Sequence, residues 1–488
     1  MFQILEAVRV LFRFFRDLRL DDHASLAAAA EHGEILPVLV LDEALREHIS
    51  RSPRRAAFYC EAVAALDEAL RARGTQLIVR RGPLVTTLLA LAKDTGSSTV
   101  VWGASYDARA MEVERDLQSR LEERGLRALL VHDSSAIPPE ETAMEKSSAG
   151  EGYRALVPYV EKWRALEVGS FEAPLFMRFA SDAPLSEPLP APEEFGSSQM
   201  QLGATPEKAS QQLAHFLGVD ALQYSVAANV PADDRTSHLS AHLSMGTIAA
   251  RTVVRETKRR IDDPFLLTEE KASLKRYLRA LAQRDFFLQL MWFNPHIAKE
   301  PLQEKMRTFP FAKSHPALDA WKAGRTGFPI VDAGIRQLHA TGWMHPRVRS
   351  IAASFLCFDL GVDWKVGLAE WDRHFIEDDP ALSTGNWQWI AGVGADLAAY
   401  PRIYNPTKQA RRFDAQGIYV RRYIPELANR FNVVQPRGGH AALELPLFGA
   451  DTYPEPVVDH EKAARDFLAR YNSWTAIDRG ASARQSNP

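Results

Sequence analysis

Two tryptophans that flank a single glutamine, Trp387 and Trp389, stand out in a short polar stretch of the sequence. The stretch reads STGNWQW at residues 383–389 and follows a run of carboxylates at residues 377–379 by a few positions. Residues at i and i+2 point to opposite faces of a strand, or about 200° apart on a helix, so the two indoles do not share one packing surface. We therefore expect them to serve two different functions.

A second group of residues with chemical potential is a cluster of hydroxyls at 235–246, in the stretch RTSHLSAHLSMG. Thr236, Ser237 and Ser240 surround an expected helix start. Hydroxyls and free backbone N–H groups at a helix N-terminus bind phosphate well. An ordinary N-cap explains the same residues and is the simpler interpretation of this stretch alone.

A third group combines aromatic and basic side chains immediately before a very apolar helix. Within the stretch at residues 325–364, Trp343, His345, Arg347 and Arg349 follow one another in seven positions. Arginines at the start of a buried helix need anionic partners. Two candidates for this anionic partner are the carboxylates at residues 377–379 and a bound ligand.

The composition limits the classes of protein that this chain can represent. Its 488 residues are 46% apolar and 25% charged with a net charge of −3, which predicts two or three globular domains and argues against a uniformly basic nucleic-acid coat. A net charge of −3 is still compatible with a local basic groove. Two cysteines, Cys60 and Cys357, are too few for a disulfide framework, a four-cysteine metal site or an iron–sulfur cluster. The N-terminus is too often interrupted by charge for a signal peptide, and we expect a cytoplasmic protein with no membrane span.

The first third of the chain must be the scaffold for an α/β domain. Near-continuous apolar runs, as in strands covered on both faces, alternate with helical patterns. Between the second and third runs a helix is expected, with Ser52 as N-cap, Pro53 at its first position and its end at Gly74. These features predict a doubly wound parallel sheet in a domain at residues 1–133. The predicted strands are 9–15, 36–42, 75–81, 98–103 and 128–133.

The rest of the chain has a different organisation. Residues 134–204 are rich in Pro, Ser and Glu, which predicts a long linker. From residue 205 helix follows helix, and in the first of them Thr205 caps, Pro206 starts and Gly218 ends the helix. We therefore predict a larger all-α domain at residues 205–472 and a short, frayed tail at residues 473–488.

Taken together, these segments resemble the DNA photolyase/cryptochrome family. FRFFRDLRLDDHASL near the start is similar to that family's N-terminal signature, and TSHLS, twelve residues after Tyr224, is similar to its flavin-phosphate motif. TGFPIVDAGIRQLHATGWMHPRVR, GNWQW and RIYNPTKQARRFDAQGIYVRRYIPEL match its densest signatures. The resemblance covers residues 9 to about 472 and implies an α/β antenna domain, a linker and a helical domain that binds FAD.

The resemblance offers an answer for the tryptophan pair. Trp387 would be the flavin-proximal member of an electron-transfer chain, with Trp364 in the middle and Trp321 at the surface. Trp389 would stack against a pyrimidine dimer flipped out of double-stranded DNA. An indole suits both tasks, because it can be oxidised and its flat face stacks on bases.

The resemblance also assigns residues to the cofactor and to the DNA. The residues implied for FAD are Tyr224, Thr236, Ser237, His238, Leu239, Ser240, Tyr277, Arg284, Arg349, Glu377, Asp379 and Ser383, the last facing flavin N5. The residues implied for the lesion are Gln283, Pro346, Arg347, Ser350, Trp389 and Gln409. No metal is implied.

Several of these positions depart from the family pattern. Ser383 stands where repair enzymes usually carry Asn, and Glu377 where Asp is usual. In the lesion pocket, Ala280 and Gln283 replace a glutamate and a tryptophan. One aromatic wall is thereby lost, and stacking is worth roughly 1–3 kcal/mol per base. The sequence therefore supports FAD binding more strongly than it supports binding of a cyclobutane dimer. Two further replacements are Pro346 for Asn and Ser350 for Met.

The sequence predicts a blue-light-driven, FAD-dependent DNA photolyase that splits UV-induced pyrimidine dimers by electron transfer, acting as a monomer. A cryptochrome-like photoreceptor and a 6–4 photoproduct repair enzyme stay open as alternatives, and a dark flavin oxidoreductase would leave the tryptophans without a role. A second antenna chromophore, a folate or a deazaflavin, is compatible with Tyr106 and Asp107.

Overall fold

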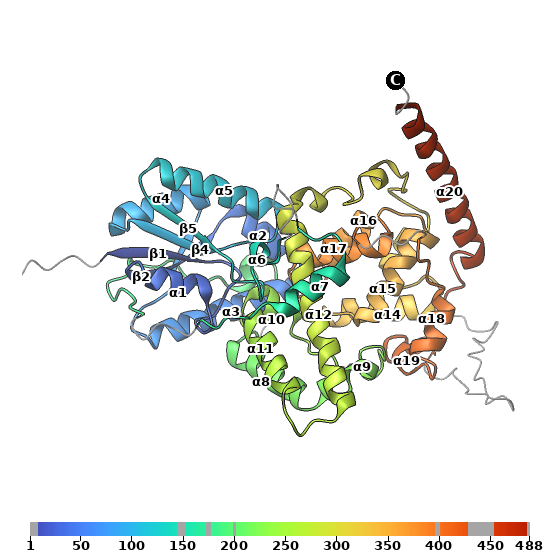
Figure 1. Cartoon of the computed structure of the whole chain (residues 1–488), viewed down its shortest axis with the longest axis horizontal. Helices are drawn as coiled ribbons and strands as arrows, with labels where there is room; N and C mark the ends of the chain where they lie inside the picture. The colour runs from blue at the N-terminus through green and yellow to red at the C-terminus, as the bar shows by residue number, and fades with distance from the viewer. Residues whose placement is uncertain are drawn as a thin grey trace, which may run out of the picture. The chain divides into compact units, whose positions relative to one another are not determined.

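The computed structural model describes residues 8–143, 152–171, 177–198, 202–395, 401–427 and 453–485, with side chains up to residue 476. It divides into two compact units that are each described by themselves. Unit 1 comprises residues 1–222, 237–298 and 376–382, and unit 2 comprises residues 223–236, 299–375 and 383–488. The elements are drawn in Figure 1.

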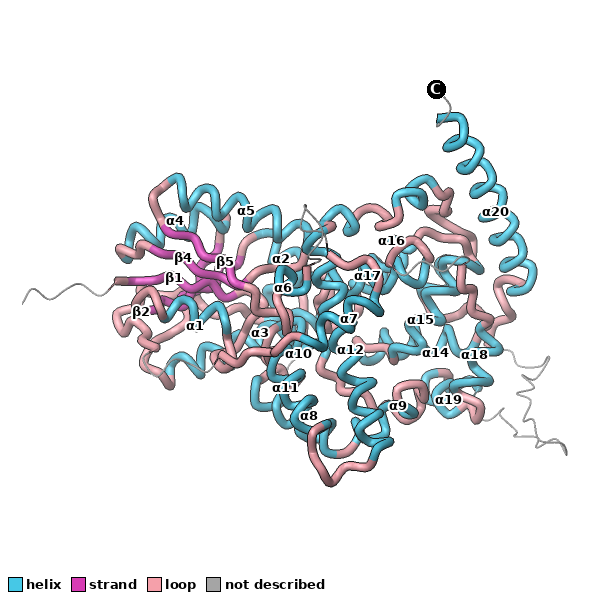
Figure 2. The backbone as a smooth tube through the Cα atoms, in the orientation of Figure 1, coloured by secondary structure: helices cyan, strands magenta, loops and turns pink. Residues whose placement is uncertain are grey.

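Unit 1 is built on a five-stranded parallel sheet with the order β3-β2-β1-β4-β5. This order confirms the predicted doubly wound sheet, and each strand overlaps its predicted range. All strands of the described residues belong to this sheet, as Figure 2 shows. The strands are β1 (Arg9–Phe14), β2 (Glu34–Leu41), β3 (Ile78–Arg81), β4 (Thr99–Gly103) and β5 (Arg127–Val131).

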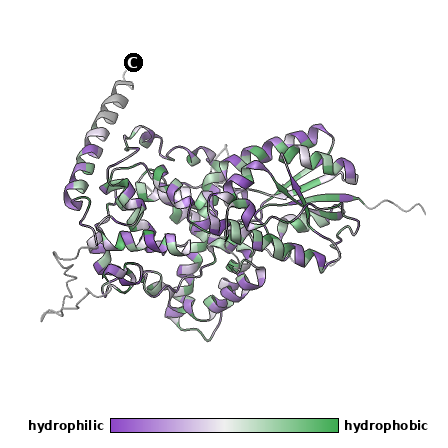
Figure 3. Cartoon of the chain, turned by 180° about the vertical axis from the view of Figure 1, so that it is seen from behind, coloured by the Kyte–Doolittle hydropathy of each residue, from purple (hydrophilic) through white to green (hydrophobic). Residues whose placement is uncertain are grey.

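Helices cover both faces of the sheet, because the strands present apolar side chains on both sides. Alternate residues of β1 enter two separate cores: Phe12 packs with residues of α1 to α3, and Leu11 packs with residues of α4 and α5. Most of the sheet is accordingly coloured as hydrophobic in Figure 3. These helices are α1 (Ala24–Ala30), α2 (Glu43–Ser50), α3 (Pro53–Arg71), α4 (Leu84–Thr95) and α5 (Ala108–Glu123).

The remaining helices of unit 1 include the first of the predicted helical domain. Ser52 and Thr205 accept the backbone N–H groups of Arg55 and Lys208, which confirms both predicted N-caps. Unit 1 extends past the boundary expected at residue 205, because residues 237–298 pack with the N-terminal segments. These helices are α6 (Pro139–Thr142), α7 (Leu156–Ala165), α8 (Pro206–Gly218), α10 (Ser240–Met245), α11 (Ala250–Ile261) and α12 (Thr268–Phe293).

Unit 2 is helical around one apolar core to which many aromatic side chains contribute. Its helices are α9 (Tyr224–Ala227), α13 (Leu318–Lys322), α14 (Pro329–Thr341), α15 (Pro346–Ser354), the π-helical turn η5 (Phe355–Asp359), α16 (Trp364–Asp372), α18 (Pro406–Phe413), α19 (Ile418–Tyr423) and α20 (His460–Gln485). The helix α17 (Pro380–Ala391) begins in unit 1 and continues in unit 2.

Two expectations about segments between and after the domains need correction. The predicted linker contains α7, whose Trp163 is fully buried, because its apolar residues recur at helical spacing. The predicted frayed tail from residue 473 continues the helix α20 as far as Gln485. Within the described residues, no helix is long and apolar enough to cross a membrane.

Candidate functional site

Charged side chains meet at the carboxyl end of β1 in unit 1. Arg16 donates to Asp378 Oδ2 at 2.9 Å and to the backbone oxygen of Asp378 at 3.1 Å, and His48 contacts the other carboxylate oxygen. Burial alone would raise the pKa of Asp378, but the charges of Arg16, His48 and Arg55 outweigh it and hold that pKa far below its ordinary value. Asp378 is therefore ionised and fixes the chain just before α17.

A second buried carboxylate of unit 1 is clamped in the same way. Asp133 accepts hydrogen bonds from Arg19 and Arg251 at 2.6 Å each, and its side chain is 1% exposed. Burial opposes its ionisation, and the charges of Arg19, His23 and Arg251 nevertheless keep its pKa far below the usual range. This pair of salt bridges ties the end of β5 to α11.

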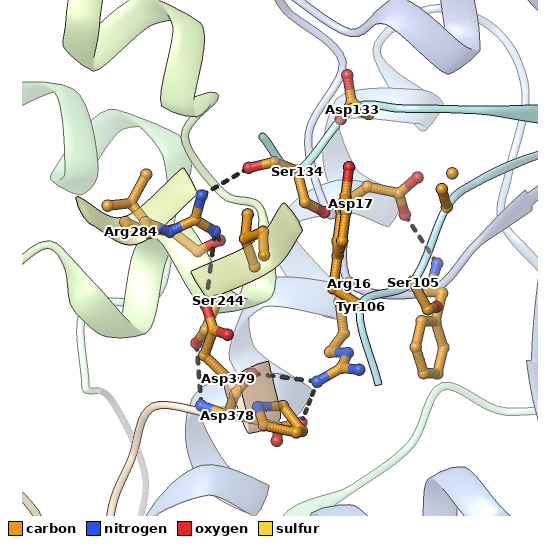
Figure 4. A pocket seen from close by; sticks show the side chains of 16 residues that line it. Arg16, Asp17, Ser105, Tyr106, Asp133, Ser134, Ser244, Arg284, Asp378 and Asp379 are labelled. Carbon is orange, nitrogen blue, oxygen red and sulfur yellow. Dashed lines mark hydrogen bonds and ion pairs between the residues drawn. The ribbon is translucent and has the colours of Figure 1, made fainter. Parts of the chain in front are cut away.

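These groups surround a small cavity at the carboxyl ends of β1, β4 and β5, the edge of a doubly wound sheet where ligands usually bind. Figure 4 shows Arg16, Ser105, Tyr106 and Arg284 around it. The cavity measures about 40 Å³, which holds a few water molecules but no chromophore. In this conformation, ion-paired side chains fill the crevice.

The residues considered for an antenna serve local structure. Tyr106 Oη lies 2.6 Å from His132 Nδ1 and 3.0 Å from Ser135 Oγ, and Asp107 caps α5 by accepting the N–H of Ala110. A second chromophore at these residues stays a prediction.

Arg284 and Asp379, both assigned to the flavin by resemblance, form an ion pair at the edge of the same cavity (Figure 4). Their charged atoms lie 3.6 Å apart, and Arg284 also donates to the backbone oxygen of Ser134 at 2.7 Å. Burial raises the pKa of Asp379 although Arg284 lowers it. Asp379 Oδ1 accepts the N–H of Leu382, so the pair is anchored at the start of α17.

The hydroxyl cluster of residues 236–240 precedes and begins α10. His238 adopts a positive φ of 49°, a conformation that is uncommon outside glycine and found at ligand sites. Thr236 Oγ1 is buried and has no hydrogen-bond partner in the described residues. An unpartnered hydroxyl beside a strained turn fits a group with acceptor oxygens, such as a phosphate.

Two further residues support this segment. Ser240 donates to Glu377 Oε2 at 3.2 Å, and the backbone oxygen of Ser237 accepts from Gln212. Leu239 is fully buried and anchors the turn in the core. Glu377 thus holds the first residue of α10 through a hydrogen bond, which is a positioning role within unit 1.

On α12, the residues that were assigned to the cofactor and the lesion differ in burial. Tyr277 is 4% exposed and its ring contacts that of Phe216 at 4.6 Å. Gln283 and Ala280 are half-buried, whereas Arg284 is buried. The helix therefore points the cofactor-assigned side chains inward and leaves the substituted family positions accessible.

The WQW stretch lies on α17, where the glutamine proves to be structural. Gln388 is 1% exposed, accepts the N–H of Leu302 at 2.8 Å and donates to the backbone oxygen of Glu300 at 2.9 Å. Trp387 is buried and Trp389 is half-buried, in agreement with two different environments. Sequence reasoning missed the role of Gln388, because only the fold reveals its two backbone partners.

Ser383 and Trp387 are one helical turn apart on α17, and Asp379 precedes Ser383 by the same interval. Residues spaced by four share one side of a helix. Trp387 fits there because Gly367 faces it: a Cβ at this glycine would lie 2.2 Å from Trp387 Cη2. The helix thus presents two of the assigned residues, Ser383 and Trp387, along one side.

A contact chain of three tryptophans crosses the core of unit 2. The ring of Trp371 lies 4.5 Å from that of Trp387 and 6.0 Å from that of Trp321, with which it is stacked at 15°. Within the described part of the chain, Trp364 contacts no other aromatic ring at such distances, although it is buried. Trp371 follows Trp364 by seven residues on the same side of α16, so the spacing of the sequence could have indicated it.

The position expected for Trp321 was wrong. Its side chain is fully buried instead of lying at the surface, because α13 packs against α15 and Trp321 Nε1 donates to the backbone oxygen of Ala352 at 3.1 Å. The indole N–H of Trp371 is buried without a hydrogen-bond partner in the described residues.

The residues of unit 2 assigned to DNA lie on α15 and α18. Arg347 donates to Asn229 Oδ1 at 2.6 Å, and its guanidinium lies 4.6 Å from the ring centroid of Phe413 on α18. Gln409, one turn before Phe413, is half-buried. Side by side, α15 and α18 therefore expose polar groups that can reach a phosphate or a base. Pro346 is exposed, and Ser350 donates to its backbone oxygen at 3.3 Å.

Arg349 and Tyr224, assigned to the cofactor, are held within unit 2. Arg349 donates to the backbone oxygen of Met344 at 2.6 Å and lies over Phe375, with 4.2 Å from its guanidinium carbon to the ring centroid. Tyr224 is the half-buried first residue of α9. Pairing of Arg347 and Arg349 with the carboxylates at 377–379 stays a prediction.

Comparisons with known proteins agree with this fold and these residues. A model of the DNA photolyase family matches residues 9–190, and a model described as the FAD binding domain of DNA photolyase matches residues 277–473. The chain is 33% identical to a deoxyribodipyrimidine photo-lyase of Halobacterium salinarum, with 94% of this chain and 98% of that protein covered. It is also 31% identical to that of Escherichia coli, over 94% and 98% of the two chains. The chain therefore belongs to the DNA photolyase family, as its sequence motifs indicated.

Solved structures of similar proteins have the same fold as this chain. A bacterial class III photolyase from Agrobacterium tumefaciens superposes with a TM-score of 0.84 at 28% identity, over 97% of this chain and 99% of that one. The cryptochrome of Synechocystis has the same fold, with a TM-score of 0.81 at 24% identity over 95% and 98%. Both predicted parts of the fold, the α/β sheet domain and the helical FAD-binding domain, are confirmed.

Proposed function

We propose that this protein is a deoxyribodipyrimidine photolyase that repairs UV-damaged DNA in a light-dependent reaction. The observation that carries the proposal is the coexistence of a matched FAD-binding domain with the aromatic chain that ends at Trp387. When bound, FAD supplies the absorption of blue light and the transferred electron; the reaction needs no general acid from the protein.

The residues of this chain fit FAD. The unpartnered hydroxyl of Thr236 and the positive φ of His238 suit the phosphates, and Tyr224, Ser237, Leu239 and Ser240 complete that segment. Arg284, Arg349, Tyr277 and Asp379 would hold the flavin region, with Glu377 acting through Ser240. Ser383 would accept a hydrogen bond from flavin N5, with a shorter reach than an asparagine.

Trp387 would reduce the cofactor, and we propose Trp371 as the second carrier. Electron tunnelling falls steeply with distance, and the Trp387–Trp371 contact at 4.5 Å and the stacked Trp371–Trp321 pair form a continuous path. The unpartnered N–H of Trp371 has no acceptor for its proton, so an oxidised indole there would pass the charge on to Trp321. Trp364, the carrier implied by resemblance, would provide an alternative branch.

The DNA would be bound by the residues implied for the lesion. Arg347 would contact a phosphate and Trp389 would stack on the flipped base, with Gln283, Pro346, Ser350 and Gln409 beside them. Flipping costs a few kcal/mol and least at a damaged pair, which contributes to selectivity. A monomer without an iron–sulfur cluster and a cytoplasmic location remain our predictions.

Repair of DNA that contains one defined lesion distinguishes between cyclobutane dimer repair, 6–4 product repair and a photoreceptor function. We expect detectable but weak repair of a cyclobutane dimer by the purified, reduced protein under blue light, because Ala280 and Gln283 have lost their family roles. The double variant Ala280→Glu, Gln283→Trp should bind the dimer more tightly by about 1–3 kcal/mol, since an aromatic wall is restored. The measurement is binding and repair of two oligonucleotides, one with a cyclobutane dimer and one with a 6–4 product.

Removing Trp389 by Trp389→Ala provides the matched control and should abolish the gain. If the double variant binds the cyclobutane dimer no better than the natural sequence, the pocket serves another ligand. Repair of the 6–4 product alone would then move the proposal to that lesion, and repair of neither would favour the photoreceptor alternative, consistent with the fold of the cryptochrome.

A further inference from the structure

Two adjacent residues of α12, Arg284 and Asp285, hold the segment of unit 1 that follows β5. Arg284 Nη1 donates to the backbone oxygen of Ser134 at 2.7 Å. Asp285 Oδ2 accepts the backbone N–H groups of Ala136 at 3.0 Å and of Ile137 at 3.3 Å. The two side chains thus bind three backbone groups of one short segment, the cation taking a carbonyl and the anion taking the N–H groups.

The carboxylate of Asp285 has further partners. Trp163 Nε1 on α7 donates to the same oxygen at 2.9 Å, and the Trp163 side chain is fully buried. The other oxygen lies 3.6 Å from Arg284 Nη1, and Asp285 is 2% exposed. A buried carboxylate with three N–H donors on one oxygen and a guanidinium beside the other has a fixed orientation, and it orients these partners in turn.

Arg284 lies between two buried carboxylates. Its Nη1 is 3.6 Å from Asp285 Oδ1, and its Nη2 is 3.6 Å from Asp379 Oδ2. Arg284 and Asp379 line the small cavity at the sheet edge (Figure 4), whereas Asp285 lies behind Arg284 and does not line it. An effect of Asp285 on a ligand bound beside Arg284 therefore passes through the guanidinium.

The charge of Asp285 changes close to neutral pH. Burial raises its pKa to about 6, although Arg284 and the hydrogen bonds that it accepts oppose this shift. Tyr106 from the loop after β4 and Tyr159 from α7 also face Asp285, and both stay neutral because burial raises their pKa values. Among the described residues, Arg284 is thus the charged group that faces Asp285.

We propose that Asp285 is a positioning residue for FAD, whose negative charge and hydrogen bonds keep Arg284 directed towards the flavin region. This inference rests on the function proposed above, in which Arg284 and Asp379 hold that region. Protonation of Asp285 removes the charge beside Arg284 Nη1, and its hydrogen bonds weaken because charge-assisted bonds are about twice as strong as neutral ones. The guanidinium is then drawn towards Asp379, the remaining carboxylate. FAD therefore binds more tightly to the form in which Asp285 is ionised.

Titration of the FAD-free, full-length protein with FAD tests this proposal, with quenching of the flavin fluorescence as the signal. Because the ionised form binds more tightly, the high affinity is present above about pH 6 and is lost below it. We expect the affinity of the natural sequence to fall by about fivefold to tenfold between pH 8 and pH 5. Asp285→Asn should bind FAD about tenfold more weakly at pH 8 and should lack this fall.

Asp67→Asn is the matched control. Asp67 is also a buried helical aspartate of unit 1, which accepts the backbone N–H of Leu77 at 2.9 Å and pairs with Arg71 at 2.7 Å. Neither partner is assigned to the cofactor, so this variant should bind FAD with the affinity and the pH dependence of the natural sequence. Circular dichroism shows that each variant is folded.

A double-mutant cycle tests whether Asp285 acts through Arg284. In the background of Arg284→Gln, the addition of Asp285→Asn should change the FAD affinity by less than about twofold. A full effect in that background, an unchanged affinity and pH dependence in Asp285→Asn, or an equal loss in Asp67→Asn would each overturn the inference. A natural sequence that binds no FAD would overturn the proposed function as well, so the two failures are distinguishable.

Discussion

The carboxylates at the sheet edge of unit 1 and the polar groups beside the aromatic core of unit 2 differ in their partners, although buried polar atoms without a partner occur in the described residues of both units. In unit 1, Asp133 and Asp378 each meet two or more cationic side chains, and the crevice at the sheet edge is filled by these pairs. In the described part of unit 2, the Trp371 N–H, Asp359 Oδ2 and Arg470 Nε stay buried without partners. Paired charges fix a geometry, whereas unpartnered groups leave hydrogen-bonding capacity unused.

The largest expected effect concerns the aromatic chain of unit 2. We expect Trp387→Phe to abolish photoreduction of the bound flavin and to leave FAD in place. Phenylalanine fills most of the volume of the indole, so the packing loss should be modest, but it cannot be oxidised by the excited cofactor. The measurement is the change in flavin absorbance under blue light with an external reductant. Unchanged photoreduction would mean that electrons enter by another path.

Two electron-transfer paths to Trp387, one through Trp371 and one through Trp364, can be distinguished with matched variants of α16. Trp371→Phe should slow photoreduction more than Trp364→Phe does, because only Trp371 contacts Trp387 and Trp321. Both residues are buried in the same helix, so each variant controls for the packing change of the other. A larger effect of Trp364→Phe would restore the carrier that the resemblance implied.

Neutralising one carboxylate of the buried charge network in unit 1 should lower the stability of the folded protein. We expect Asp133→Asn to lower the free energy of unfolding by about 3–5 kcal/mol, because Arg19 and Arg251 would remain buried without their anion. Denaturant unfolding followed by circular dichroism measures this effect. Asp116→Asn, which breaks the exposed pair with Arg120, serves as the control and should change stability little. Equal effects of the two variants would contradict the stabilising role of the buried charge network.

A smaller effect comes from a buried histidine of unit 1. Burial lowers the pKa of His242 to about 4, so the folded protein keeps it neutral at pH 5 while an unfolded histidine takes up a proton. Stability therefore falls as the pH drops from about 6.5 towards 4, by roughly 2 kcal/mol between pH 7 and pH 5 from this residue.

The comparison of the natural sequence with His242→Gln isolates this contribution. Asp285, whose pKa burial raises to about 6, acts in the opposite direction but is common to both proteins. The variant should lose about 2 kcal/mol less than the natural sequence does between pH 7 and pH 5 in denaturant unfolding. An identical loss in both proteins would show that His242 is not the titrating group.

The sequence predicted the local features of this molecule well. The strands and the caps Ser52 and Thr205 depend on nearby residues, and the structure confirms them. The family motifs likewise located the FAD-binding domain. These features require only short-range chemistry or ordered matches to a known pattern.

Features that depend on packing between distant helices could not be predicted. Trp371 joins Trp321 and Trp387 only because α13, α16 and α17 meet in one core, and the same packing buries Trp321. The structural role of Gln388 depends on hydrogen bonds to two backbone groups more than eighty residues away in sequence. The inclusion of residues 237–298 in unit 1 also results from long-range contacts rather than from local composition.

Repair measured against flavin content tests the proposed photolyase activity most directly. The protein would be stripped of FAD, partly reconstituted to several occupancies, reduced, and illuminated with oligonucleotides that contain a cyclobutane dimer or a 6–4 product. We predict repair of one lesion that is absent in the dark, absent without FAD and proportional to the bound flavin. Repair in darkness, repair that is independent of FAD, or a protein that binds no FAD at all would contradict the account.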